Sequence, residues 1–548
     1  MQDQHEQKAA DRRLFFSGVL FLGAANIIVK VIGLFFKIPM SYSLGDVGMG
    51  YFNSAYQIYT WLYMLSTAGL PVAVSILISE SVAKGDLVRA RRTVKLSGLV
   101  FLLLGIGSSA LMFFGAQSFA DLIGSPDAAY CIAAMSPTLF FICISSALRG
   151  YFQGYRQMAP SAVSQILEAL GKLAVGVALA YWAQGKGYSL PVTAAFAVSG
   201  LAVGEAAGTL YLLLARRSYE RNGRLLPSGV TAKGILETGL FRRLVSIAFP
   251  ITVSASVMSL SGLIDLVLIQ RRLQDIGYSV AEATAFYGNY TTLVVPMFNL
   301  PPALIYPIAT AVTPVLAATF AQKDGRNISR TMESLFRVTV LIALPCALGM
   351  SVFARPILRL LFRADMADSA APYLSLLALA VVFLALLTVS NAVLQAGQNA
   401  GKATLSMFIG ATVKFLSNYF LIGIPAIGTF GVPLGTLLCY LTATLCNLLF
   451  AFRRISISLS FGKIFLRPFA ASLLSVGAAS GLYLLLGGDA SDKFSVVFCI
   501  LLAAAVYLAC VFLLGCLTEE DLAFIPYGKK ISAFLQFSPP KQRFFRKK

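Results

Sequence analysis

Four basic side chains lie inside otherwise apolar stretches of this chain: Lys30, Lys172, Arg337 and Lys414. A cation in the hydrocarbon of a bilayer costs about 3 kcal/mol or more at the centre of a helix. Such a side chain therefore usually faces a water-filled cavity, an acidic partner or an anionic ligand. Lys172 and Lys414 are 242 residues apart in similar surroundings, which indicates that an internal repeat places a cation twice for an anionic ligand.

The positions of the lysines along their apolar stretches favour one anion-binding site. Lys172 and Lys414 lie about eleven or twelve residues into their predicted helices, which is near the bilayer midplane at about 1.5 Å per residue. Lys30 lies deeper along the first helix, and Lys37 lies at its outer end. Because ammonium groups donate well to phosphate oxygens, we expect these four lysines to bind an anionic head group.

Acidic residues inside the apolar stretches allow a different interpretation of the charges. Glu168 precedes Lys172 by four residues, so the two side chains share a helix face and are able to pair. Glu205 and Asp265 are further acids of this kind, and all three carboxylates suit either a coupling ion or structural ion pairs. Arg337 lies close to the cytoplasmic edge, where we expect it to snorkel.

The composition requires a membrane as the environment of these charges. Hydrophobic residues make up 57% of the chain, charged residues 12%, and the mean hydropathy is +0.77. Continuous apolar runs of about 20 residues predict membrane-spanning helices rather than barrel strands. We predict an all-α polytopic membrane protein with fourteen spans, at 14–36, 51–79, 96–115, 128–148, 161–183, 191–215, 244–269, 286–320, 334–353, 371–396, 403–423, 431–452, 464–486 and 494–515. The second and eighth runs contain prolines, which predicts kinked helices.

The basic residues outside the spans predict the topology. With the N-terminus inside, the cytoplasmic connections hold 32 of the 44 Lys and Arg residues, and the opposite connections hold 8. This asymmetry follows the positive-inside rule, and it explains the net charge of +20 without nucleic acid. We therefore expect a multi-pass protein of the cytoplasmic membrane with both termini in the cytoplasm and the loops near Asp121 and Gly428 outside.

Matching segments indicate an internal repeat and a division into two lobes. The loop at Gln153 and Gly154 corresponds to Gln395 and Ala396, and 83–86 resembles 321–325. Both copies cross the membrane in the same direction, as in transporters of two facing lobes that alternate in access. The predicted domains are an N-terminal lobe 1–215, a basic cytoplasmic linker 216–243, a C-terminal lobe 244–452, two appended helices in 453–515 and a basic tail 516–548 that suits an anionic lipid surface.

Signatures of catalysis and of metal binding are absent from the sequence. The only histidine is His5 in the polar N-terminal segment, and the eight cysteines form no CxxC motif. No GxxxxGK[ST], HExxH or GxSxG motif occurs, so we expect no enzyme, no catalytic residue, no metal site and no cofactor. Energy for transport would then come from the membrane potential, from H⁺ or Na⁺ gradients, or from mass action.

Three motifs carry a resemblance to a known family. They are Leu65-Ser-Thr-Ala-Gly-Leu-Pro-Val-Ala-Val74 followed by Glu80 and Lys84-Gly85-Asp86, Leu148-Arg-Gly-Tyr-Phe-Gln-Gly154 with Gln157 and Pro160, and Arg355-Pro-Ile-Leu-Arg-Leu-Leu-Phe362. Together they resemble the stage V sporulation protein B-like polysaccharide transport proteins of the multidrug/oligosaccharidyl-lipid/polysaccharide (MOP) exporter superfamily, to which MurJ-type lipid II flippases are related. The resemblance implies two six-helix lobes plus C-terminal helices, and a cationic cavity in which first-helix basic residues, here Lys30 and Lys37, are important.

The charges and the resemblance together favour a flippase for an undecaprenyl-diphosphate-linked oligosaccharide or peptidoglycan precursor. Its expected partners are this lipid-linked anionic glycan, membrane lipids and cell-wall synthesis enzymes. Two alternatives stay open. A multidrug or cation antiporter of the same superfamily would need unpaired carboxylates, whereas the first helix carries lysine. A non-transporting scaffold for cell-wall or spore-envelope assembly would need no intramembrane lysines.

Overall fold

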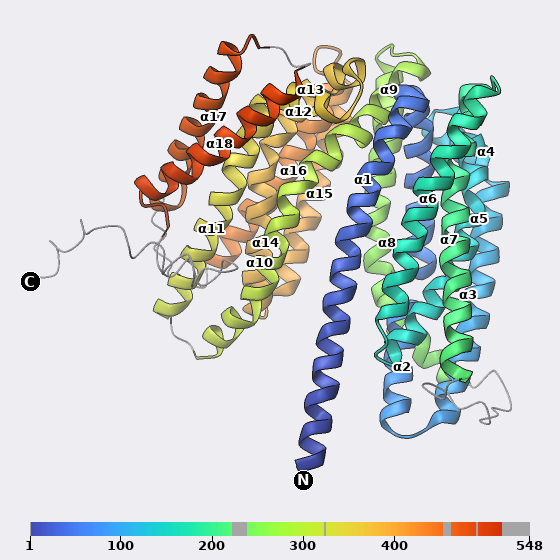
Figure 1. The fold of residues 1–548 in the computed structure, drawn as a ribbon. Coiled ribbons are helices and arrows are strands. Elements are labelled where there is room, and N and C mark those ends of the chain that lie inside the picture. Colours follow the sequence, from blue (N-terminus) through green and yellow to red (C-terminus); the bar gives the residue numbers. More distant parts are fainter. Residues whose placement is uncertain (1, 222–237, 323–324, 453–461, 489–491, 518–548) are drawn as a thin grey trace, which may run out of the picture. The chain divides into compact units, whose positions relative to one another are not determined.

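The computed structural model describes residues 2–221, 238–322, 325–452, 462–488 and 492–517, and every regular element in these ranges is a helix (Figure 1). The predicted all-α class is therefore confirmed. Most of the predicted basic linker and nearly all of the predicted basic tail lie outside the described residues, so both stay predictions.

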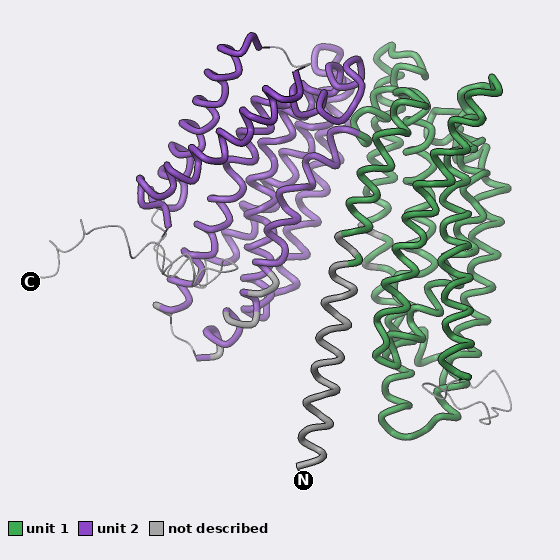
Figure 2. Tube along the Cα trace, viewed as in Figure 1, with its two compact units in different colours: residues 1–292 green, residues 293–548 purple. Residues whose placement is uncertain are grey.

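The chain divides into two compact units, Met1–Thr292 and Leu293–Lys548 (Figure 2). The first unit holds the helix that follows the predicted linker, because α8 packs along α1 and α2. The lobe boundaries predicted from the linker, 215 and 244, are not tested by this division and stay a prediction.

The first unit contains nine α-helices among the described residues. They are α1 (Gln2–Thr67), α2 (Leu70–Ala83), α3 (Leu87–Phe114), α4 (Ala116–Ile123), α5 (Ala129–Gly154), α6 (Ala159–Gly185), α7 (Leu190–Arg221), α8 (Thr238–Asp275) and α9 (Val280–Asn289). A 3₁₀ turn, η1 (Pro126–Ala128), precedes α5, and a π-helical segment, η2 (Tyr290–Val294), follows α9.

The second unit contains the remaining helices of the described residues. They are α10 (Val295–Ala321), α11 (Gly325–Val352), α12 (Ala354–Leu361), α13 (Ala364–Ala378), α14 (Ala380–Ala396), α15 (Ala400–Ile422), α16 (Gly431–Phe452), α17 (Arg467–Leu485) and α18 (Lys493–Leu513). Short segments η3 (Gly428–Phe430) and η4 (Gly462–Leu466) precede α16 and α17.

The number of spans differs from the predicted fourteen. Among the described residues, eleven helices are long and apolar enough to cross a membrane, or up to twelve if the bent pair α13 and α14 is one span. One reason is that Ile28–Ala83 counts once, although two predicted spans fall on it. Another is that α8, which covers the predicted span 244–269, is not among the eleven. A multi-pass membrane protein is confirmed, whereas the count of fourteen stays a prediction.

Helix α1 folds back on itself at Gly45. The backbone there is non-helical, with φ 63° and ψ −168°, a left-handed φ that glycine adopts without the strain of a Cβ. The rings of Phe36 and Phe52 lie only 5.6 Å apart, although sixteen residues of straight helix would separate them by about 24 Å. The half of α1 that carries Lys37 therefore packs beside the half that carries Phe52.

The predicted interruptions of the two long proline-rich runs are confirmed. The first breaks after Thr67, and α2 restarts at Leu70 with Pro71 in its first turn. The second passes through the π-helical segment η2 directly before Pro296. Proline suits both places because its missing N–H removes no hydrogen bond in the first turn of a helix.

The helix boundaries of the first unit recur in the second unit, as the internal repeat predicts. The pair α3 and α4 spans 87–114 and 116–123, and the pair α11 and α12 spans 325–352 and 354–361, an offset of 238 residues at every boundary. Helix α15 begins 241 residues after α6, and α16 begins 241 residues after α7. The helices therefore follow the same order in both copies, α3 and α4 match α11 and α12 in length, and the second copy has three additional residues between α12 and α15.

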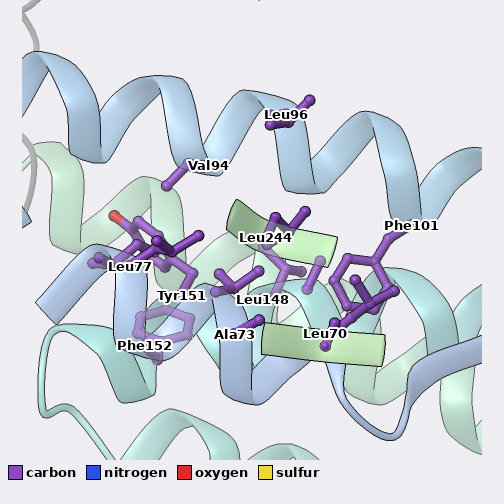
Figure 3. Close-up of a cluster of buried hydrophobic side chains, with 14 of the residues drawn as sticks. Leu70, Ala73, Leu77, Val94, Leu96, Phe101, Leu148, Tyr151, Phe152 and Leu244 are labelled. Carbon is purple, nitrogen blue, oxygen red and sulfur yellow. The ribbon is translucent and has the colours of Figure 1, made fainter. Parts of the chain in front are cut away.

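A cluster of buried apolar side chains joins α2, α3, α5 and α8 in the first unit (Figure 3). Leu148 of α5 belongs to it and is 5% exposed, and Leu77 and Leu244 meet in the same cluster. Because successive residues of a helix project about 100° apart, the packing of Leu148 turns residue 149 to another side of α5. The cluster thereby sets the direction of the arginine that follows.

Candidate anion-binding site

Lys172 of α6 lies against aromatic rings of α1. Its Nζ is 4.6 Å from the centre of the Phe36 ring and 5.2 Å from that of Tyr56. The electron-rich faces of such rings attract an ammonium group, by about 2 kcal/mol when the pair is shielded from water. Lys172 makes no hydrogen bond or ion pair with any residue that the structure describes. Its three N–H donors are therefore open to water or to a ligand.

Lys37 lies close to Lys172 in the same unit. Its Nζ donates a hydrogen bond to the backbone oxygen of Thr291, at 2.9 Å, in the π-helical segment η2. This bond uses one of three donors. The two ammonium groups are near enough for mutual electrostatic repulsion. Two neighbouring cations in a region shielded from water are stabilised by an anion between or beside them.

Arg149 of α5 holds the two nearby carboxylates of the first unit. Its Nη2 lies 3.0 Å from Glu168 Oε2 and 3.9 Å from Glu205 Oε1, and its Nε donates to Ser164 Oγ at 3.2 Å. Ser145 donates a hydrogen bond to the same oxygen of Glu205, which is fully buried. The interpretation that Glu168 pairs with Lys172 is therefore wrong in this structure, because α5 supplies a better-placed guanidinium.

The glycines of α6 and α7 allow these charges to meet. A Cβ on Gly204 would lie 2.5 Å from the backbone oxygen of Glu168, and one on Gly171 would lie 2.6 Å from the Cα of Gly204. Small residues at such crossings let two helix backbones approach closely inside a membrane. The close approach brings Glu205, the residue after Gly204, next to Glu168 and Arg149.

Arg149 and the aromatic residues near Lys172 were not predicted from the sequence. Span four was predicted to end at residue 148, which placed Arg149 in a loop, but α5 continues to Gly154 and the Arg149 side chain is only 12% exposed. A signal was available, because Glu168 and Glu205 together need more positive charge than one lysine supplies. Phe36 and Tyr56 gave no signal, since aromatic residues are common in membrane helices.

The other predicted residues are distributed over both units. Lys30 is exposed on α1, two turns before Lys37 on the same helix face. Lys414 of α15 is half-buried in the second unit, and Asp265 of α8 is half-buried in the first. Their roles as ligands of a substrate or a coupling ion are untested and stay predictions.

Arg337 differs from its expected position. It is 7% exposed in α11, and its Nη2 lies 3.4 Å from Glu333 Oε1, one turn earlier in the same helix. The snorkelling prediction is therefore wrong, because the side chain is covered by neighbouring helices and has an acidic partner within reach. This residue belongs to an ion pair of the second unit.

Comparison with known families assigns the chain to one of them. A family model described as "Polysaccharide biosynthesis protein" matches residues 15–320, which is more than half of the chain. The chain belongs to this polysaccharide biosynthesis protein family. A second family model, MatE, matches residues 288–420 and so covers part of the second unit.

Relatives of this polysaccharide biosynthesis protein include two from Bacillus subtilis (strain 168). Stage V sporulation protein B is 26% identical over 520 residues, which is 94% of this chain and 98% of the relative. Lipid II flippase MurJ is 24% identical over 446 residues, which is 78% of this chain and 80% of the relative. The resemblance inferred from the three sequence motifs is thus confirmed at the level of the family, and stage V sporulation protein B, which that resemblance named, is among the relatives.

Solved structures of the superfamily share the fold. A lipid II flippase MurJ in an inward closed conformation aligns with a TM-score of 0.66 at 17% identity, over 90% of this chain and 98% of the other. An inward-facing multidrug resistance MATE family transporter aligns with a TM-score of 0.64 at 16% identity, over 80% of this chain and 98% of the other. At these identities the likeness concerns the helix arrangement alone.

Proposed function

We propose that this protein is a flippase that moves an undecaprenyl-diphosphate-linked glycan, of the oligosaccharide or peptidoglycan-precursor type, across the cytoplasmic membrane by alternating access. The observation that carries the proposal is the pair formed by Lys37 and Lys172, whose ammonium groups lie near each other within membrane helices. A diphosphate supplies the negative charge and the acceptor oxygens that this pair lacks.

Two carboxylates of the first unit, Glu168 and Glu205, support an anionic rather than a cationic substrate. Glu168 and Glu205 both lie on Arg149, so neither is presented alone to a cation. The MatE match to residues 288–420 is the reason to consider a multidrug or cation antiporter. Such an antiporter would use carboxylates of this kind as its binding groups. The family match over residues 15–320 and the names of the relatives agree with a lipid-linked glycan precursor.

The membrane potential is a sufficient source of energy for such a substrate. Moving one elementary charge across 100 mV is worth about 2.3 kcal/mol, and an anion moves outward favourably from a negative interior. We propose the orientation with both termini in the cytoplasm and, as partners, the cell-wall synthesis enzymes that make the precursor inside and use it outside. No chemical step on the substrate is needed.

The test replaces the native protein by variants in its own cell and measures lipid-linked precursors on each leaflet. Lys172→Gln is expected to accumulate one precursor on the inner leaflet at normal membrane abundance of the protein, whereas Lys172→Arg keeps most of the transport. Lys186→Gln is the matched control, because Lys186 is an exposed lysine just after the end of α6. Normal precursor distribution with Lys172→Gln, or accumulation with Lys186→Gln alike, contradicts the proposal.

A further inference from the structure

A row of aromatic rings runs along α1 beside the lysines. The rings of Phe52, Tyr56, Tyr59 and Tyr63 contact each other in sequence, with centroid distances of 6.4, 5.7 and 6.0 Å. Their spacing of four, three and four residues places them on one helix face. The fold-back at Gly45 adds Phe36 to the end of the row.

The members of the row differ in exposure. Phe36, Phe52 and Tyr59 are buried and so belong to the packing between helices. Tyr56 is 39% exposed and Tyr63 is half-buried. The row therefore offers two accessible rings, one helical repeat of seven residues apart, and the packed rings between and beside them hold these two in place.

The accessible ring of Tyr56 lies next to the proposed diphosphate site. The ammonium of Lys172 is 5.2 Å from the centre of that ring and has no described acceptor. A group of this charge does not face hydrocarbon stably, so the surface that Lys172 and Tyr56 share is one that water or a polar ligand reaches. Glu168, which is 33% exposed, lies within electrostatic range of the Tyr56 hydroxyl.

The chemistry of this surface matches a sugar bonded to a phosphate. A pyranose ring has a C–H face that packs on an aromatic ring and a rim of hydroxyls that hydrogen-bond to phenol, carboxylate and guanidinium groups. In a glycosyl diphosphate the first sugar is attached directly to a phosphate, so its ring lies about one ring diameter from the anionic oxygens. The distance between Lys172 and the Tyr56 ring is of that size.

We propose that Tyr56 and Tyr63 bind the first sugar of the substrate and thereby select a glycosyl-diphosphate lipid over the same lipid diphosphate without sugar. The inference rests on the proposed function, since it takes the diphosphate to be held by Lys37 and Lys172. Tyr56 acts as a specificity-determining residue, and Glu168, which is bonded to Arg149, lies within electrostatic range of its hydroxyl.

The experiment compares two probes on the full-length purified protein in lipid nanodiscs: undecaprenyl diphosphate, and undecaprenyl diphosphate carrying one N-acetylglucosamine. Wild type is expected to bind the sugar-bearing lipid more tightly. Tyr56→Leu should lower the affinity for that lipid by about three- to tenfold, which is the size of an aromatic contact. The affinity for undecaprenyl diphosphate without sugar should stay within about twofold of wild type. Tyr56→Trp should keep the preference. Tyr42→Leu is the matched control, an exposed tyrosine of α1 at 46% outside the row.

The outcomes separate this inference from the proposed function. If Tyr56→Leu weakens the binding of both probes equally, Tyr56 only supports Lys172, and if it weakens the binding of neither, the ring serves packing alone. Both results overturn the sugar site. Loss of binding in Lys172→Gln would still support the diphosphate site in either case. Full binding of both probes by Lys172→Gln overturns the diphosphate site and the sugar site with it. Thermal unfolding of each variant identifies a folding defect. If Tyr56→Leu has such a defect, Tyr56→Phe, which keeps the ring, is measured in its place and should keep the preference for the sugar-bearing lipid.

Discussion

Glu168 and Lys172 lie one turn apart on α6, yet the Glu168 carboxylate binds Arg149 at 3.0 Å and the Lys172 ammonium lies over two aromatic rings. The two opposite charges thus have separate surroundings on the same helix. Arg149 contacts both Glu168 and Glu205, so the carboxylate one turn before Lys172 is already bonded to a guanidinium. Removing Arg149 is therefore expected to affect both groups.

Arg149→Gln should destabilise the protein by about 3–5 kcal/mol, the cost of leaving a buried charge without its partner. The cause is Glu205, whose fully buried carboxylate would lose the nearby guanidinium and keep the hydrogen bond from Ser145. Thermal unfolding of the purified protein measures the loss. The double variant Arg149→Gln with Glu205→Gln should recover part of it, because the uncompensated charge is gone, and a strictly additive loss in this double-mutant cycle contradicts the ion pair.

The double variant Lys30→Gln with Lys414→Gln tests the two lysines whose roles the structure leaves open. We expect it to lower precursor export by about tenfold or more, since a hydrogen bond to a charged group is worth about 1.5–3 kcal/mol. Growth of a strain that depends on this protein gives the readout, and immunoblots of the membrane fraction check abundance. Full export activity of the double variant would falsify the role of these two lysines in an anion site and favour the cation antiporter.

Gly204→Ala is expected to weaken the crossing of α6 and α7, because its Cβ would be forced against the backbone of Glu168. The helices would have to separate, which lowers the unfolding temperature and loosens the contact between Arg149 and Glu168. Gly98→Ala in α3 is the control, since a Cβ there meets open space. Alanine favours a helix over glycine by about 1 kcal/mol, so the control should be neutral or slightly more stable. Equal behaviour of the two variants argues against the close crossing.

The topology is tested by single cysteines in a background without the eight native ones. Cysteines introduced at Asp121 and Gly428 should react with a membrane-impermeant thiol reagent added to intact cells, and a cysteine at Gly85 should not. The asymmetric distribution of Lys and Arg is the reason for this expectation. Labelling at Gly85 without labelling at Asp121 reverses the predicted orientation.

The sequence predicted the helical class, the repeat and the family, because apolar run length and motif spacing are local properties of a chain. It placed Lys37 and Lys172 as ligand candidates, since the cost of a cation in hydrocarbon is independent of the fold. The partner of Glu168 was not predictable, because Arg149 reaches it from another helix across a glycine crossing. The fold-back at Gly45 was not predictable either, because a single glycine is its signal in the sequence. The neighbourhood of Phe36 and Tyr56 depends on this fold-back.

The break at Gly45 also makes the preceding helix a lever arm. A change in the backbone torsions of that one residue would swing the helix before it, at no cost in helical hydrogen bonds within that helix. At a rise of about 1.5 Å per residue, Lys37 sits about 12 Å from the pivot and Lys30 about 22 Å. A rotation of about 10° would then carry Lys37 through about 2 Å and Lys30 through about 4 Å. A change at one glycine would thus move both lysines together, with a larger displacement for Lys30 than for Lys37.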